Sequence, residues 1–198
     1  MMREASDTRK EQIIQAAMEI IVTDGLEKLT MQRLGGAVGI TDAAIYKHFA
    51  GKQEVLLAMI STIRQQLLRH VRQHMEASES PLEKLQLLLQ GHLQFIEEQD
   101  GTPHLLFSEA LYTSDPELRN TIRQIIAEYT GLVRNIAVKG RSTGELREDL
   151  DPGAVPVALL GLIQSSVMQW VLSDRAYSLA AQTGHLWNIF EHGIRSQE

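Results

Sequence analysis

Residues 29–49, LTMQRLGGAVGITDAAIYKHF, hold the side chains best suited to chemistry with a partner molecule. Ala43 and Ala44 are small, and small side chains let the start of a helix approach base edges in a DNA groove. Tyr46 and Lys47 follow them and carry groups that can reach phosphate oxygens. These residue types favour the binding of a polyanion over a covalent reaction.

Two short helices are needed to position these side chains. Thr30 and Thr41 each stand where a hydroxyl can accept from the first backbone N–H groups of a helix. Gly39 lies between them and can adopt the positive φ of a tight turn. The small core between the helices would be formed by Leu34, Val38, Ile40 and Ile45. The pattern predicts a helix-turn-helix over residues 30–38 and 41–47.

Lys52 is a second indication of a polyanionic partner. It stands at the expected start of a long helix, where the macrodipole makes a cation unfavourable by about 0.3–1 kcal/mol. A phosphate bound at that helix N-terminus would turn the penalty into an attraction.

Gly35 and Gly36 stand within the first of the two short helices. Each glycine costs a helix about 1 kcal/mol relative to alanine. We therefore expect this pair to permit a close approach to the neighbouring helix.

Helical periodicity extends over nearly the whole chain, and we predict an all-α fold of about nine helices. Ser80-Pro81 with Glu83, Asp115-Pro116 and Asp151-Pro152 are typical helix starts, the first with a capping box. Besides the two short helices after Thr30 and Thr41, helices are expected over about 8–24, 52–77, 81 onward, 103–113, 116–139, 152–173 and 177–195.

The charge is unevenly distributed. The net charge is −6, but residues 1–75 have a balance of +2 and residues 76–198 a balance of −8. A slightly basic front and an acidic body are what a nucleic-acid-binding head on a non-binding body would show.

The composition indicates a cytoplasmic protein. The chain has no cysteine, no apolar run near the ~18 residues of a membrane span, and no apolar signal segment at its start. We expect no membrane association.

Other constellations favour neither a metal site nor an enzyme. His70 and His74 are four residues apart on an expected helix but lack a third ligand, and we expect them to face solvent. His92 and His104 flank acidic residues at a helix end, where such groups are usually solvated, and Ser108 lacks a nucleophile-elbow context. We predict no metal, no cofactor and no catalytic residue.

The stretch from Thr8 to Leu56 resembles the DNA-binding domain of the TetR family of repressors. The runs AAMEIIVTDGLEKLT and ITDAAIYKHFAGKQEVL carry the resemblance, which covers the first quarter of the chain. The chain departs from the family at Gly35-Gly36, usually alanine and a polar residue, and at Val38, usually alanine. The resemblance implies that Ala43, Ala44 and Lys47 lie nearest the bases. It places at the DNA surface Thr30, Arg33, Thr41, Ala43, Ala44, Tyr46, Lys47, His48 and Lys52.

The resemblance also implies a homodimer with two domains, a DNA-binding domain over 1–51 and an effector-binding and dimerisation domain over 52–198. Two recognition helices related by a two-fold axis would read a palindromic operator. TetR-like proteins pair their last two helices into a four-helix bundle, here about 152–173 and 177–195. The candidate contacts are Val157, Leu160, Gly161, Gln164, Ser165, Met168 and Leu172 on the first, and Ala180, Ala181, Gly184, Leu186, Trp187, Phe190 and Ile194 on the second.

The same resemblance implies a pocket in the body for a small apolar or amphipathic effector. Residues at helical spacing that can line it, or can equally form plain core, are Met59, Ile63, Leu67, Leu88, His92, Phe95, Phe107, Leu111, Tyr112, Tyr129 and Gln164.

The sequence thus predicts a DNA-binding transcriptional regulator, a repressor released from its operator by an effector. A body that binds another protein, as in nucleoid occlusion, is the alternative, and an exposed apolar body surface with no enclosed cavity would favour it. An enzyme built on this all-α body is the third hypothesis.

Overall fold

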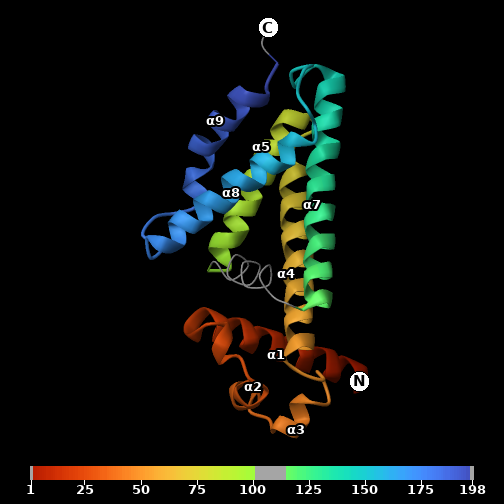
Figure 1. Cartoon of the computed structure of the whole chain (residues 1–198), viewed down its shortest axis with the longest axis vertical. Coiled ribbons are helices and arrows are strands. Elements are labelled where there is room, and N and C mark those ends of the chain that lie inside the picture. The colour runs from red at the N-terminus through yellow and green to blue at the C-terminus, as the bar shows by residue number, and fades with distance from the viewer. Residues whose placement is uncertain (1, 101–114, 197–198) are drawn as a thin grey trace. The chain divides into compact units, whose positions relative to one another are not determined.

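The computed structural model describes residues 2–100 and 115–196, with side chains from Thr8 onward. Its regular elements are α1 (Met2–Asp24), the 3-10 turn η1 (Leu26–Lys28), α2 (Met31–Val38), α3 (Asp42–Ile45), α4 (Lys52–Met75), α5 (Pro81–Glu98), α7 (Pro116–Thr143), α8 (Ala154–Leu172), the 3-10 turn η2 (Ala180–Gln182) and α9 (Thr183–Ile194) (Figure 1). These eight α-helices confirm the all-α prediction. The helix expected over 103–113 lies outside the described residues.

The described residues divide into two compact units. The first holds residues 2–64 and 115–122, and the second holds 65–100 and 123–196. Helices α4 and α7 contribute to both, and the first turns of α4 belong with α1, α2 and α3. The domain boundary after residue 51 stays a prediction.

In the first unit, α2 packs against both α1 and α3 (Figure 1). The contacts are apolar, and full burial of an aliphatic side chain stabilises the fold by about 1.5–3 kcal/mol. The core side chains of this unit include Ile13, Ala17, Leu29, Leu34, Ile45, Phe49, Val55, Met59, Ile60 and Ile63. Of the four residues predicted for the core between the short helices, Leu34 and Ile45 are buried, whereas Val38 and Ile40 are half-buried.

The turn between α2 and α3 has the predicted capping chemistry. Thr30 Oγ1 accepts from Arg33 N at 3.1 Å, and Thr41 Oγ1 accepts from Ala44 N at 3.3 Å. Gly39 ends α2 in the left-handed region with φ 70°. The next amide, Ile40 N, donates to Gly35 O at 2.9 Å and closes the turn. These bonds satisfy the N–H and C=O groups that helix ends leave free.

The two adjacent glycines of α2 have different surroundings. A Cβ on Gly35 would lie 2.9 Å from the carbonyl oxygen of Ile40 and 3.2 Å from Oδ1 of Asp42. A Cβ on Gly36 would meet no atom within 4 Å. Close approach therefore explains Gly35, and nothing in the structure explains Gly36.

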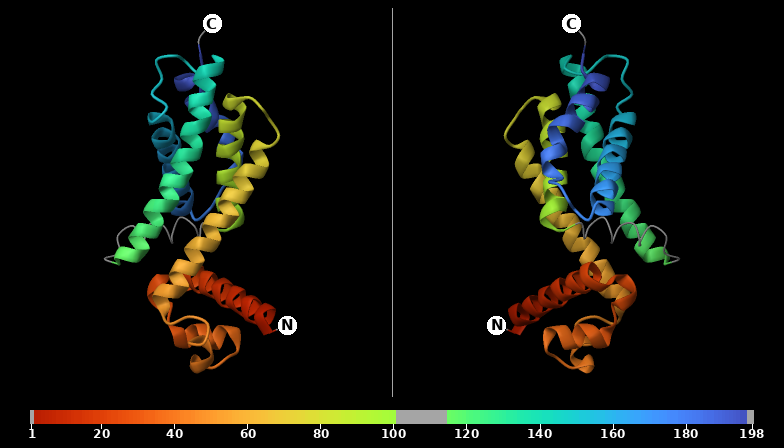
Figure 2. Two further views of the ribbon diagram at one scale, coloured as in Figure 1. Left: turned by 90° about the vertical axis from the view of Figure 1, so that its right-hand side faces the viewer. Right: turned by 90° about the vertical axis from the view of Figure 1, so that its left-hand side faces the viewer.

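In the second unit, α5 packs against α8, η2 and α9. Both views of Figure 2 show α5 beside the second half of α4, where His74 Nε2 contacts Gln94 Oε1 at 3.2 Å. The buried side chains of this unit include Leu85, Leu88, Leu89, Leu93, Phe95, Val133, Leu146, Leu159, Ile163, Val167, Trp170 and Trp187.

Two predicted helix starts of the body have the expected cap. Ser80 Oγ accepts from Glu83 N at 3.2 Å, and Asp115 Oδ1 accepts from Leu118 N at 2.9 Å. The capping box is only half formed, because Glu83 accepts from the Ser78 hydroxyl rather than from Ser80 N. Ser78 Oγ in turn accepts from Ser80 N at 3.0 Å.

Three other helices do not begin at the predicted residue. Helix α1 begins at Met2 rather than near Thr8, and α8 begins at Ala154 rather than at Pro152. Helix α9 begins at Thr183 rather than near Tyr177. Its start is displaced because the Glu97 carboxylate of α5 accepts from Leu179 N at 3.1 Å and Ala180 N at 2.9 Å. These hydrogen bonds hold the residues just before α9 in a turn.

The contrast between the two glycines predicts opposite effects of the same substitution. Gly35→Ala should lower the free energy of unfolding by about 1–3 kcal/mol, because the Ile40 carbonyl is backbone and must shift. Gly36→Ala should raise it by up to about 1 kcal/mol through helix propensity. Urea unfolding followed by circular dichroism measures both. A Gly35→Ala variant as stable as Gly36→Ala would contradict the close approach.

Candidate DNA-binding surface and ligand site

The face of α3 that does not contact the core is open to solvent. Thr41, Ala43 and Lys47 are exposed, and the large Tyr46 side chain is 54% exposed. Ala44 is half-buried beside the fully buried Ile45. Tyr46 and Lys47 follow α3, which ends at Ile45 rather than at the predicted Lys47. Both side chains are exposed and are therefore available to a partner.

Two of the predicted phosphate contacts already have partners within the protein. The Arg33 guanidinium forms an ion pair with Asp24 at the end of α1. Lys52 Nζ donates to the carbonyl oxygen of Leu26 at 2.9 Å and so ties the start of α4 to η1. Neither contact is visible in local sequence spacing, because the partners are 9 and 26 residues away. Both cations keep further N–H donors for a phosphate.

The start of α4 also carries its own anion. Glu54 Oε2 accepts from Ala50 N at 2.6 Å, just before Lys52. The carboxylate complements the positive end of the helix dipole. A DNA phosphate at this helix start would therefore share the site with Glu54.

Thr30 and His48 complete the predicted surface. Thr30 is exposed, whereas His48 is half-buried. His48 Nδ1 is buried and has no hydrogen-bond partner in the described parts of the chain. Contact with a phosphate would then fall to Nε2 of the ring.

The predicted ligand residues do not share one environment. Leu67, Leu88, Phe95 and Tyr129 are buried in the second unit, whereas Gln164 on α8 is exposed. Met59 and Ile63 are buried on the part of α4 that belongs to the first unit. Phe107, Leu111 and Tyr112 lie outside the described residues.

His92 and Tyr129 form a polar pair inside the apolar core of the second unit. His92 Nδ1 lies 2.6 Å from the Tyr129 hydroxyl, with the rings edge to face at 5.1 Å between centroids. Burial lowers the pKa of His92 from 6.5 to about 4 and raises the pKa of Tyr129 well above its usual 10. Both side chains are therefore neutral near pH 7. The pair can offer a hydrogen bond to a ligand without placing a charge in the core.

The prediction that His70 and His74 face solvent is wrong. Both are half-buried, with ring centroids 4.6 Å apart. His74 packs over Gly91 of α5, where a Cβ would lie 3.1 Å from its ring. Burial, and then the neighbouring His74, lower the pKa of His70. No group of three or more His, Cys, Asp or Glu that could hold a metal occurs in residues 2–100 and 115–196.

A surface cleft of about 510 Å³ lies elsewhere in the second unit, and none of the predicted ligand residues lines it. Glu145, on one wall, accepts from the Ser80 hydroxyl, from Leu82 N at 3.2 Å and from Thr143 Oγ1 at 3.1 Å. Burial raises its pKa, but these hydrogen bonds outweigh burial, so the pKa lies below the ordinary value. Glu145 thus anchors the start of α5 to the loop after α7.

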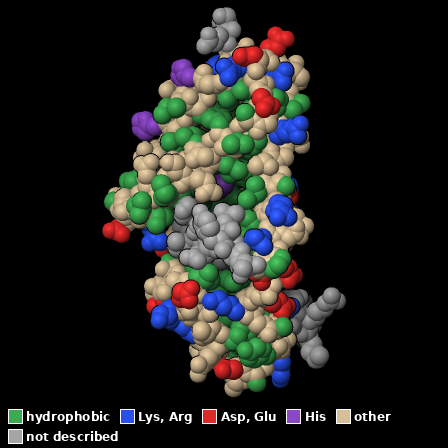
Figure 3. All heavy atoms as spheres, in the orientation of Figure 1, with side chains coloured by type: hydrophobic (Ala, Val, Ile, Leu, Met, Phe, Trp, Pro, Cys, Tyr) green, Lys and Arg blue, Asp and Glu red, His purple; other side chains and the backbone are tan. Residues whose placement is uncertain are grey.

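An apolar surface runs along α8. Figure 3 shows hydrophobic side chains exposed over α8 and α9. On α8, Val157 is 70% and Leu172 is 76% exposed. Of the predicted contacts between them, Leu160 is half-buried, and the exposed ones are Gly161, Gln164, Ser165 and Met168. By length and composition alone, α8 is the one described helix that is able to cross a membrane.

The predicted contacts on α9 need correction. Trp187, Phe190 and Ile194 are buried within the unit itself, so they belong to its core. The exposed side of α9 instead carries Ile189, which is 71% exposed. The periodicity of the sequence predicted an apolar face on α9, but it could not predict that this face packs against α5.

A capped helix-turn-helix with an open second helix, followed by an all-α body, defines a DNA-binding transcriptional regulator. The family model for bacterial regulatory proteins of the tetR family matches residues 13–59. The model for the C-terminal region of YsiA-like proteins of this family matches residues 62–193. The chain belongs to the TetR family, and it is a regulator rather than an enzyme.

Two curated relatives align over nearly the whole chain. The fatty acid metabolism regulator protein of Bacillus subtilis (strain 168) is 26% identical over 186 residues, 94% of this chain and 95% of the relative. The nucleoid occlusion factor SlmA of Vibrio cholerae is 26% identical over 188 residues, 94% of this chain and 96% of the relative.

Solved structures agree with the fold. The regulator FadR from Bacillus subtilis in complex with stearoyl-CoA has a TM-score of 0.83 at 25% identity and covers 93% of this chain and 99% of its own. FadR from Bacillus halodurans has a TM-score of 0.84 at 24% identity and covers 95% and 97%. TetR-family regulators bind operator DNA, dimerise and bind small-molecule ligands.

Buried His92 predicts a dependence of stability on pH. Between pH 6.5 and about 4 the unfolded chain binds a proton that folded His92 does not. The free energy of unfolding should therefore fall as pH drops through this window, by roughly 3 kcal/mol from His92 alone.

Urea unfolding at stepped pH measures this fall. His92→Gln should make it shallower, whereas His192→Gln, which changes an exposed histidine, should leave it as in the wild type. Equal slopes in the wild type and His92→Gln would contradict a buried, neutral His92.

Proposed function

We propose that the protein is a cytoplasmic repressor that binds a palindromic operator as a homodimer and leaves it when a small effector binds the body. The observation that carries the proposal is the open face of α3, held on a capped helix-turn-helix in a chain of the TetR family.

The proposed DNA contacts are divided by chemistry. Ala43 and Ala44 allow close approach to base edges, and Lys47 beside them can reach a flanking phosphate. The remaining contacts go to phosphates and are supplied by Thr30, Arg33, Thr41, Tyr46, His48 and Lys52. Arg33 and Lys52 would use the donors that Asp24 and Leu26 leave available.

The proposed dimer interface is formed by α8 with the exposed side of α9. An exposed apolar surface on a folded domain marks an interaction site, and α8 has small residues, Gly161 and Ser165, that allow close helix contact. A two-fold axis through this surface would pair α8 and α9 of the two subunits. The apolar composition of α8 is then explained by subunit contact.

The proposed effector is amphipathic, with a long apolar part and a polar group. A carbonyl or hydroxyl group of such a ligand would meet the neutral polar pair of His92 and Tyr129 inside the apolar core of the second unit. The relative described as a fatty acid metabolism regulator, and the similar structure with stearoyl-CoA, support a long-chain acyl thioester.

Release from DNA requires two conformations with different ligand affinity. A ligand that binds the DNA-incompetent conformation more tightly shifts the population toward it, and by linkage operator DNA weakens ligand binding by the same factor. Helices α4 and α7 each belong in part to both units, so such a change would pass through them.

A body that binds a protein is the second candidate. The equal identity to the nucleoid occlusion factor SlmA favours it. Titration of the operator complex with long-chain acyl-CoA separates the two candidates, with free CoA as the matched control. Release by the acyl thioester alone supports the effector. No release by either compound favours the protein partner.

Lys47 provides the test of the DNA-binding face. Lys47→Ala should weaken operator binding and lower the slope of log affinity against log salt by about 1 per recognition helix, or about 2 per dimer. Lys139→Ala removes an exposed lysine from α7 and should leave the slope unchanged. Fluorescence anisotropy over a series of salt concentrations measures both. An unchanged slope for Lys47→Ala would contradict the proposal that the surface of α3 contacts DNA.

Val157 and Val138 are matched probes of the dimer interface. They are 70% and 49% exposed, on α8 and α7 respectively. Val157→Glu should convert the dimer to a monomer, because an unpaired charge would be buried in the interface. Val138→Glu should leave the dimer intact. Sedimentation velocity gives the mass of each, and a dimeric Val157→Glu would place the interface elsewhere.

A further inference from the structure

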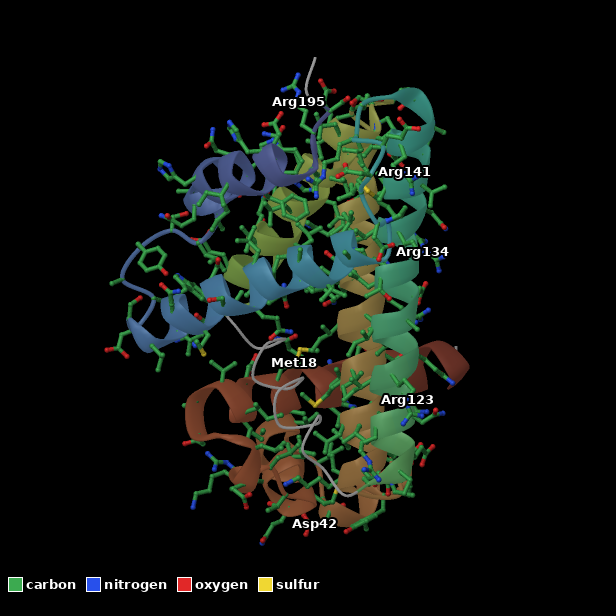
Figure 4. All side chains as sticks on the ribbon, turned by 45° about the horizontal axis from the view of Figure 1, so that its top comes forward. Met18, Asp42, Arg123, Arg134, Arg141 and Arg195 are labelled. Carbon is green, nitrogen blue, oxygen red and sulfur yellow. The ribbon has the colours of Figure 1, made fainter. Side chains whose placement is uncertain are left out.

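Asp42, the first residue of α3, is a carboxylate on the face that is open to DNA. Figure 4 shows it at the edge of the first unit, on the surface that α3 forms. Its side chain is exposed, and no hydrogen bond or ion pair to it occurs in the described portion of the chain. It is not needed as the helix cap, because Thr41 Oγ1 already accepts from Ala44 N.

A carboxylate in this position opposes DNA binding unless it has a partner there. Phosphates on both strands repel it, and it stands among residues that the proposed function brings to the major groove. The donor that a major groove offers to a carboxylate is the N4 amino group of cytosine. Arginine and lysine would prefer guanine, and asparagine would prefer adenine.

Among the residues at the start of α3, Asp42 is the one whose side chain is left to form a hydrogen bond with a base. Ala43 and Ala44 have no polar side-chain atoms, and the Thr41 hydroxyl, whose oxygen accepts in the cap, is assigned to a phosphate. Gly35 of α2 gives the carboxylate its space, because a Cβ there would lie 3.2 Å from Asp42 Oδ1. The glycine thereby sets where the carboxylate lies on the surface.

We propose that Asp42 is a specificity-determining residue, which accepts a hydrogen bond from cytosine N4 and fixes a C·G pair at one symmetric position in each half-site. The inference rests on the proposed operator binding and deepens it. A correct contact of this kind is worth about tenfold in affinity per half-site over the other three pairs.

Selection of bound duplexes from a random library by the full-length protein tests the assignment. The wild type should enrich a C·G pair at a symmetric position. Asp42→Ala should lose the preference at that position alone, and Asp42→Asn should move it toward A·T. Glu27→Gln is the control, since it removes an exposed carboxylate of the same unit from η1 and should keep the cytosine.

Three results would overturn the inference. Asp42→Ala could enrich the wild-type sequence unchanged, or the base lost on substitution could be other than cytosine. In either case the protein still binds an operator and the proposed function stands. If the wild type enriches no sequence at all, the proposed function and this inference fall together.

Discussion

The recognition helix is four residues long, and everything proposed for this protein depends on how it is held. A helix of one turn does not persist on its own, because nucleation fixes several dihedral angles for a single hydrogen bond. Burial of Ile45, the Thr41 cap and the bond from Ile40 N to Gly35 O provide the missing stabilisation. Gly35 is the tightest point, since any side chain there would displace the turn.

The second unit uses apolar residues for two separate purposes. Those on α5 and the inner sides of α8 and α9 form a core, in which His92 and Tyr129 are a neutral polar pair. Those on the outer side of α8 remain exposed and fit a subunit contact. The Glu97 and Glu145 carboxylates hold the loops that connect these helices, each through backbone amides of a distant segment. The two carboxylates thus tie the two ends of α5 to segments that are distant in the sequence.

Most helix starts that depend on a local contact could be predicted from the sequence. The Asp151-Pro152 start is the exception, because Asp151 Oδ1 accepts from Gly153 N and α8 begins two residues later than predicted. The caps at Thr30, Thr41, Ser80 and Asp115 each involve residues three apart, and all four are present. The start of α9 could not be predicted, because Glu97, which displaces it, lies 82 residues before Leu179.

The candidate site was predictable to the same extent. The exposure of Tyr46 and Lys47 follows from the pattern of the short helices. The partners of Arg33 and Lys52 do not, because α1 and η1 reach them only in the folded unit. The burial of Trp187 and Phe190 likewise depended on which neighbour α9 packs against.

Hydroxyl-radical footprinting of the full-length protein on its selected operator tests the central claim most directly, because it reports how many recognition helices bind and where. The account predicts two protected patches, related by a two-fold axis, on one face of the duplex. Their centres should lie about one helical turn apart, 10–10.5 base pairs, or a multiple of it. A single patch, or weak protection spread evenly along the duplex, would contradict a dimer that reads DNA through α3.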